Sequence, residues 1–285
     1  MRPGLILKLS SPDHPGIVAK IASYVASHSG NLIEFSQFSD QLQKKFFARL
    51  EIDTSNLNVD IEDFKSGFGT LGRSLQATWH FRVLPYKMKT AVLVTKTDHC
   101  LNEILWRTGL NELPIEITSI IGNRGNCRQI AEQAGLPFHE IDMDGDKREA
   151  GFQQIRSLLV KQNVELIVLA RFMQILPDAF CQEFSGRIIN IHHSFLPAFI
   201  GANPYKQAHV RGVKLIGATC HYVTADLDAG PIIEQEVDRV SHFHSPSDLS
   251  RLGRHCERIA LAKGIRYHVH DRTIIDGHRA IVFPD

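Results

Sequence analysis

The sequence predicts an α/β protein with two domains, a ferredoxin-like βαββαβ domain followed by a Rossmann-like domain with a mostly parallel sheet. Apolar residues before Pro85 follow strand and helix periods in the order β-α-β-β-α-β. Beyond Pro85, short apolar runs alternate with helical patterns, which is typical of parallel strands covered on both faces. We therefore predict domains over residues 1–85 and 86–285.

The first domain is predicted from short, clearly periodic segments. Asp13 is expected to cap the first helix, with Pro15 in its first turn, and Gly30 to end it. In 46–53, apolar and charged residues alternate, which indicates a half-buried strand with Arg49 on its polar face. The expected strands are 5–9, 31–38, 46–53 and 79–83, and the expected helices are 17–29 and 61–75.

The second domain is predicted from fully apolar strands separated by amphipathic helices. This pattern indicates a sheet whose strands are buried on both faces. The expected strands are 91–95, 115–122, 164–170, 187–191, 214–223 and 231–240, and the expected helices are 98–109, 126–134, 147–162 and 247–263.

Composition narrows the class of protein. The chain has 285 residues, 32 Lys+Arg against 31 Asp+Glu, so no charge imbalance indicates a nucleic-acid or membrane partner. The five cysteines are scattered and without metal-binding spacing, which favours reduced thiols in a cytoplasmic protein. The N-terminal apolar run is interrupted by Lys8 and is too short for a signal peptide.

Two polar clusters stand out. Asn190 and His192 lie two residues apart on a predicted strand, so they share one face near its carboxyl end, where α/β sheets bind ligands. Asp228 lies in a loop before Gly230. Backbone groups could satisfy the first pair, and Asp228 could be a solvated turn residue. If the clusters meet, Asn190 could donate to an oxyanion, His192 supply charge and a proton, and Asp228 act as base.

These residues carry a family resemblance. The segment NIHHSFLP (190–197) and the downstream DAG (228–230) resemble the N-I-H-x-S-x-L-P and D-x-G motifs of folate-dependent formyltransferases. The resemblance extends over most of 88–285. It implies that Asn190, His192 and Asp228 form a catalytic trio that acts on the formyl group at N10 of tetrahydrofolate.

The resemblance also implies a folate pocket. One wall would be LARFMQIL (169–176), whose alternative role is ordinary core, and the other wall would close with the loop 223–228. The residues expected to bind folate are Met173, Gln174, Ile175, Leu176, His221 and Val223. The folate is the substrate, so no cofactor is expected.

The formyl acceptor is inferred from a departure from the family pattern. Members that transfer formyl to glycinamide ribonucleotide carry a glycine-rich phosphate loop after their first strand. Here VTKTDHCLNEIL (94–105) has no glycine and contains Asp98, which favours water as the acceptor. The chain thus resembles the hydrolytic members, which release formate that can feed purine synthesis. Transfer to an amine and a catalytically silent binding regulator remain alternatives.

The N-terminal domain resembles the ACT family of small-molecule sensors. Asp13 and Gly16 match its D-x-x-G turn, and Asn31 is a second candidate contact with an effector. The resemblance implies regulation by an amino acid, with methionine and glycine as candidates, and assembly into a homo-oligomer. A purely structural or dimerising module is the alternative.

The spacing of the histidines does not indicate a metal site. His192–His193 and His242-x-His244 lack any HExxH pattern, so we predict no metal and a supporting role for His193. The role of Asp226 stays open.

Overall fold

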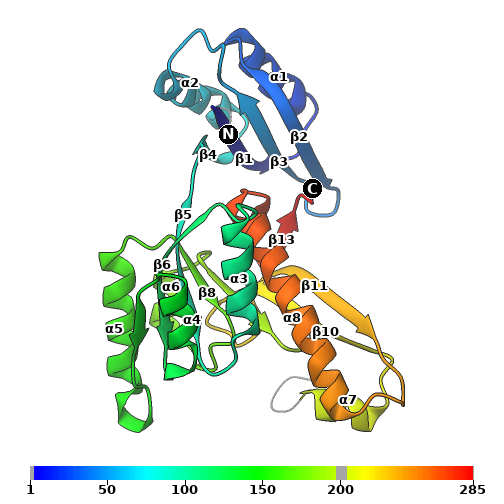
Figure 1. The fold of residues 1–285 in the computed structure, drawn as a ribbon. Helices are drawn as coiled ribbons and strands as arrows, with labels where there is room; N and C mark the ends of the chain where they lie inside the picture. Colours follow the sequence, from blue (N-terminus) through cyan, green and yellow to red (C-terminus); the bar gives the residue numbers. More distant parts are fainter. Residues whose placement is uncertain (1–2, 197–203, 285) are drawn as a thin grey trace. The chain divides into compact units, whose positions relative to one another are not determined.

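The computed structural model describes residues 3–196 and 204–284, and it confirms the predicted α/β class. The chain divides into two compact units (Figure 1). Unit 1 comprises 1–86, 271–274 and 281–285, and unit 2 comprises 87–270 and 275–280. Two short segments near the C-terminus thus group with the first unit.

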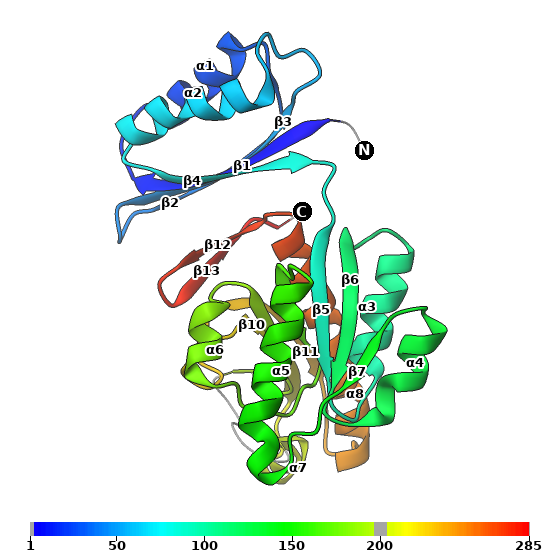
Figure 2. The same cartoon turned by 90° about the vertical axis from the view of Figure 1, so that its left-hand side faces the viewer.

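Unit 1 is an antiparallel four-stranded sheet in the order β2-β3-β1-β4, with both helices on one face (Figure 2). This is the predicted ferredoxin-like arrangement. Apolar side chains from the helices and the inner sheet face form a single core. The elements are β1 (Gly4–Pro12), α1 (Ile17–Ser27), β2 (Asn31–Asp40), β3 (Lys45–Asp53), α2 (Ile61–Ser74) and β4 (Thr78–Leu84).

Two predictions for unit 1 were wrong. Gly16, not Asp13, is the N-cap of α1, since the chain turns through a left-handed conformation at Gly16, with φ of 90°. Arg49 is buried, although the alternation placed it on a solvated face. Its guanidinium is paired with Glu34 at 2.8 Å, so the charge is compensated inside the sheet layer.

Unit 2 is a seven-stranded sheet in the order β11-β10-β9-β8-β5-β6-β7. The strands from β9 to β7 are parallel, and β10 and β11 are antiparallel to their neighbours. The strands are β5 (Met88–Val94), β6 (Ile115–Gly122), β7 (Phe138–Glu140), β8 (Leu166–Leu169), β9 (Ile188–His192), β10 (Leu215–Tyr222) and β11 (Ile232–Arg239).

Helices cover both faces of this sheet, as Figure 2 shows with α3 and α4 on one side and α5 and α6 on the other. Helix α8 packs on α3, β9, β10 and β11. The helices are α3 (His99–Gly109), α4 (Arg128–Gln133), α5 (Arg148–Lys161), α6 (Asp178–Glu183), α7 (Pro204–Arg211) and α8 (Pro246–Val269). A hairpin of β12 (Thr273–Asp276) and β13 (Arg279–Val282) follows.

The sheet reverses its strand order between β5 and β8, because the chain runs from β5 outward to β7 and then returns to β8. Loops leave such a switch point in opposite directions, which opens a crevice beyond the carboxyl ends of the strands. The predicted polar residues follow this edge.

Candidate active site

Asn190 and His192 lie among the last three residues of β9, on one face of the strand, as the sequence pattern predicts. The neighbouring strand β10 is antiparallel, and its register sets His221 opposite Asn190. The side chains of Asn190, His192 and His221 therefore converge where β9 and β10 pair.

Asp228 reaches the same point because of a tight turn. The loop after β10 returns at Gly230, where a Cβ atom would lie 1.8 Å from the carbonyl oxygen of Tyr222, so only glycine fits. Asp228 itself has φ of 54°, a left-handed conformation that aspartate tolerates better than most residues. The close return of the chain at Gly230 thus directs the carboxylate toward β9.

The carboxylate of Asp228 pairs with His192. The Nδ1 atom of His192 lies 3.1 Å from Oδ2 of Asp228, and both side chains are largely buried. Although burial alone would raise it, hydrogen bonds from His192 and His221 hold the pKa of Asp228 well below its ordinary value. Asp228 is therefore an anion that orients the ring of His192.

The opposite nitrogen of His192 is unoccupied. Nε2 is buried and has no hydrogen-bond partner among the described residues. A buried polar atom without a partner is costly unless a ligand satisfies it. With Nδ1 bound to Asp228, Nε2 is available to an oxygen or nitrogen of a substrate.

Asn190 is oriented by His221. Nδ1 of His221 donates to the carbonyl of Tyr222 at 2.9 Å, and its Nε2 lies 3.2 Å from Nδ2 of Asn190 and 3.6 Å from Oδ1 of Asp228. The second amide hydrogen of Asn190 remains available. An amide donor beside an imidazole is suited to a developing oxyanion.

A pocket of about 260 Å³ contains these groups. Every residue predicted to be catalytic or to bind folate lines it: Met173, Gln174, Ile175, Leu176, Asn190, His192, His221, Val223 and Asp228. Two more residues line the pocket: Arg171, which lies within the predicted wall 169–176 but was given no role of its own, and His193, for which a supporting role is predicted. Asp226 does not line it and is exposed. Pro197 of the motif lies outside the described residues.

The wall after β8 is fixed by its backbone. The amide N–H of Met173 donates to Oγ1 of Thr95 at 3.0 Å, which ties this segment to the end of β5. The side chains of Met173 and Ile175 are each 57% exposed. Such large apolar side chains at a pocket mouth gain free energy when a flat apolar ligand covers them.

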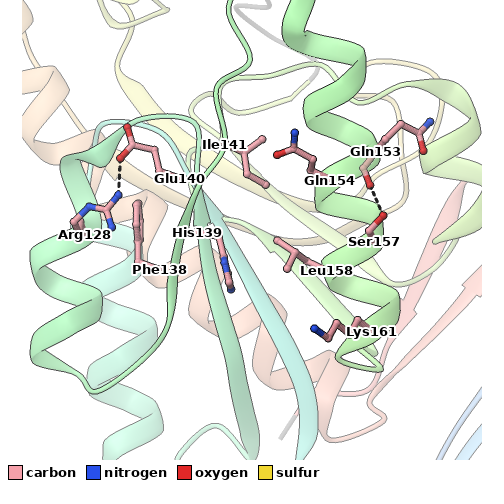
Figure 3. Close-up of a pocket in the computed structure, with 10 residues that line it drawn as sticks. All are labelled: Arg128, Phe138, His139, Glu140, Ile141, Gln153, Gln154, Ser157, Leu158 and Lys161. Atoms are coloured by element: carbon pink, nitrogen blue, oxygen red, sulfur yellow. Dashed lines mark hydrogen bonds and ion pairs between the residues drawn. The ribbon is translucent and has the colours of Figure 1, made fainter.

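A larger cavity of about 690 Å³ lies elsewhere in unit 2, beside β7 and between α4 and α5 (Figure 3). Its polar groups are largely engaged with one another. Arg128 pairs with Glu140 at 2.7 Å, and the hydroxyl of Ser157 donates to the carbonyl of Gln153. It holds no convergent set of catalytic groups, so size alone does not identify the site.

One group within the described residues brings possible metal ligands together, namely His99, Cys100 and Glu257. Nε2 of His99 donates to Glu257 at 2.7 Å, and the hydroxyl of Tyr205 donates to its other oxygen at 2.8 Å. Burial raises the pKa of the Cys100 thiol well above its ordinary value, so no thiolate is available. This donor set fits a hydrogen-bonded cluster better than a metal site.

In unit 1, the predicted effector residues lie near the start of α1 and at the start of β2. Gly16 has open space around the position of a Cβ atom. The amide of Asp13 donates to the carbonyl of Lys44 at 2.8 Å, and Asn31 is exposed at the first position of β2. The structure records no contact between the side chains of Asp13 and Asn31.

Comparison with known proteins agrees with this geometry. The formyl transferase family model matches residues 88–265. A formyltetrahydrofolate deformylase from Synechocystis sp. is 44% identical over 97% of this chain and 97% of its own length. The chain belongs to the formyltetrahydrofolate deformylase family. The crystal structure of a formyltetrahydrofolate deformylase from Pseudomonas syringae superposes with a TM-score of 0.96 at 40% identity, covering 100% of this chain and 95% of that one.

The similarity to a transformylase covers only part of this chain. A glycinamide ribonucleotide transformylase from Symbiobacterium toebii has a TM-score of 0.67 at 29% identity and covers 71% of this chain and 97% of its own. In the structure, the segment between β5 and α3 is short, and Asp98 is the N-cap of α3.

Within the described residues, no helix is long and apolar enough to cross a membrane.

Proposed function

We propose that this protein hydrolyses 10-formyltetrahydrofolate to tetrahydrofolate and formate. The observation that carries the proposal is the environment of His192 in the pocket: its Nδ1 lies 3.1 Å from Asp228, and its buried Nε2 has no hydrogen-bond partner among the described residues. Membership of the formyltetrahydrofolate deformylase family supports it.

The carbonyl oxygen of the formyl group binds between Asn190 and His192. Asn190 Nδ2–H and a protonated His192 Nε2–H donate to this oxygen, and both bonds strengthen as negative charge develops in the transition state. Asp228 stabilises the imidazolium and fixes its orientation. These roles rest on the positions of the side chains around one pocket.

The reaction consumes one water molecule. As the water oxygen bonds to the formyl carbon, the water releases one proton. The bond from carbon to N10 then breaks, N10 receives the proton from His192, and the proton released by the water restores protonated His192. Formic acid then releases a proton to solvent, leaving formate and tetrahydrofolate. No bound metal or cofactor is required by this sequence of bond changes.

Folate occupies the pocket between the segment after β8 and the loop after β10. Met173, Ile175 and Leu176 supply apolar contacts on one wall, and Val223 on the other. Gln174 and the exposed backbone supply hydrogen bonds to the pterin edge. The formate that hydrolysis releases is a one-carbon unit that can enter purine synthesis.

Unit 1 is proposed to be an ACT-type regulatory module that binds an amino acid near Asp13, Gly16 and Asn31. Because hydrolysis discards an activated one-carbon unit, we expect its rate to be controlled by an effector. We also propose that the protein forms a homo-oligomer in the cytoplasm. The edge strand β2 offers a surface for pairing between copies, because its side chains Ile33 and Phe38 are 50% and 43% exposed. Light scattering after gel filtration measures the mass of the assembly.

The function is tested by supplying 10-formyltetrahydrofolate with and without glycinamide ribonucleotide. Hydrolysis predicts tetrahydrofolate formation at the same rate in both mixtures and no formylated amine. Tetrahydrofolate formation that requires the amine would show a transferase instead. No turnover in either mixture, with folate still bound, would favour a binding regulator.

A further inference from the structure

Two adjacent histidines at the end of β9 face opposite charges. The ring centroids of His192 and His193 lie 5.2 Å apart, and both rings line the catalytic pocket. His192 is paired with the carboxylate of Asp228, whereas the nearby guanidinium of Arg171 acts on His193. Neighbouring titratable groups in opposite environments are a common arrangement of acid and base in active sites.

Arg171 is held in place by a buried carboxylate. Its Nε atom lies 3.4 Å from Oε2 of Glu257, and the side chains of Arg171 and Glu257 are 16% and 1% exposed. Burial opposes ionisation of Glu257, but the hydrogen bond from His99 and the charge of Arg171 hold its pKa below the ordinary value. The carboxylate therefore stays charged and fixes Arg171 beside the pocket.

Other elements complete this cluster. Tyr205 on α7 donates to Glu257, and its ring centroid lies 6.3 Å from that of His193. Gly253 on α8 makes room for Tyr205, because a Cβ atom there would lie 2.0 Å from the hydroxyl oxygen. His193 thus lies beside Tyr205 of α7, and Glu257 of α8 holds both Tyr205 and Arg171.

His193 is neutral at physiological pH. Burial and the charge of Arg171 lower its pKa to about 4, with a smaller contribution from His192; Glu257 and Asp228 act in the opposite direction. No hydrogen bond within the described part of the chain occupies its ring nitrogens. The ring therefore offers a free lone pair to the pocket. Asp228 is a poorer proton acceptor because its carboxylate is committed to His192.

We propose that His193 is a further catalytic residue, which accepts a hydrogen bond and then a proton from the attacking water, and that Arg171 and Glu257 are positioning residues that keep it unprotonated. This inference rests on the proposed hydrolysis. As the water oxygen bonds to the formyl carbon, one water proton moves to His193. As the bond to N10 breaks, His192 gives its proton to N10. Formic acid loses a proton to solvent, and His193 returns its proton to His192, so both rings regain their initial states.

The decisive experiment compares two nucleophiles in the full-length protein. Hydroxylamine is uncharged at neutral pH and attacks a formyl group without prior deprotonation, whereas water needs a base. His193→Gln should lower kcat for hydrolysis by about 100-fold, the lower end of general-base effects, with little change in KM. Its rate of formohydroxamate formation with added hydroxylamine should stay within about threefold of wild type. His192→Gln should lose both reactions, because it removes activation of the carbonyl.

The outcomes separate the two proposals. Loss of both reactions in His193→Gln, in proportion, would overturn the inference and indicate a structural role. Full hydrolysis by the same variant would also overturn it. Absence of hydrolysis in the wild-type protein would instead overturn the proposed function, and this inference with it.

A second measurement needs no turnover. Titration of ¹³C-labelled histidine rings by NMR, with His193 assigned from the His193→Gln spectrum, reports its pKa directly. Arg171→Met removes a cation that opposes protonation and should raise the pKa of His193 by about one unit or more. Arg171→Lys keeps the charge and is the control. An unchanged pKa in Arg171→Met would contradict the positioning role.

Discussion

At the scale of single residues, the site depends on how each charge is paired. Asp228 pairs with His192, and Glu257 pairs with Arg171, so each carboxylate fixes one basic side chain that lines the pocket. That Asn190, His192 and Asp228 belong to one site could be predicted because they lie in short motifs. Arg171 and Glu257 could not, since they are distant in sequence and become partners only through packing of α8 on the sheet.

Asp228→Asn tests the pairing with His192. An amide cannot stabilise the imidazolium, so kcat should fall by about 10²–10⁴-fold while KM changes little. Steady-state kinetics on 10-formyltetrahydrofolate measure this. Asp226→Asn is the matched control, because Asp226 is exposed in the same loop and outside the pocket lining, and it should stay within about twofold of wild type. Equal rates for both variants and the wild-type protein would remove Asp228 from the mechanism.

At the scale of elements, β9, β10 and the turn at Gly230 bring the trio together. The long periodic strands and helices could be predicted from the sequence because each carries several repeats of its period. The sequence does not predict β7, which has 3 residues, or α6, which has 6, because such short elements show no repeated hydrophobic period. Helix α7 is also not predicted. Because α7 carries Tyr205, the sequence could not predict that Tyr205 and Glu257 lie behind His193.

Gly230→Ala tests the turn. The added methyl group would meet the carbonyl of Tyr222, so the loop must shift and carry Asp228 away from His192. We expect kcat to fall by at least tenfold with a loss of stability of about 1–3 kcal/mol. Gly109→Ala serves as a control, because nothing lies within 4 Å of its Cβ position, and activity should be retained. An active Gly230→Ala enzyme would show that the turn does not set the position of Asp228.

At the scale of the whole molecule, the C-terminal segment contributes to the stability of unit 1. Asp271 is 2% exposed and pairs with Lys8 at 2.9 Å and with Arg82. Burial acts in the opposite direction, but the charges of Lys8 and Arg82 hold its pKa below the ordinary value. Sequence periodicity could not predict this, because the partners are separated by most of the chain.

Asp271→Asn should lower the free energy of unfolding by about 3 kcal/mol at pH 7, since it removes the buried carboxylate that pairs with Lys8 and Arg82. The folded pKa is depressed, so this contribution is present above the ordinary carboxyl pKa of about 4 and is lost as the pH falls through the folded value. Denaturant unfolding at pH 7 and pH 3 should show the difference from wild type shrinking. Glu62→Gln, which removes an exposed ion pair with Lys65, is the control and should change stability little. A difference that is independent of pH would contradict the assignment.

Regulation also belongs to the whole molecule. Calorimetry of the full chain with single amino acids, methionine and glycine first, should show binding that changes the rate of hydrolysis. Asn31→Ala should weaken that binding, whereas Asn56→Ala, also exposed in unit 1, should not. Equal affinity in both variants would place the effector site elsewhere.

The most direct test of hydrolysis is a reaction in ¹⁸O-labelled water with 10-formyltetrahydrofolate and no amine. We predict one tetrahydrofolate for each formate, and one ¹⁸O atom in every formate formed. Formate without ¹⁸O, or no formate until an amine acceptor is added, would contradict hydrolysis at this site.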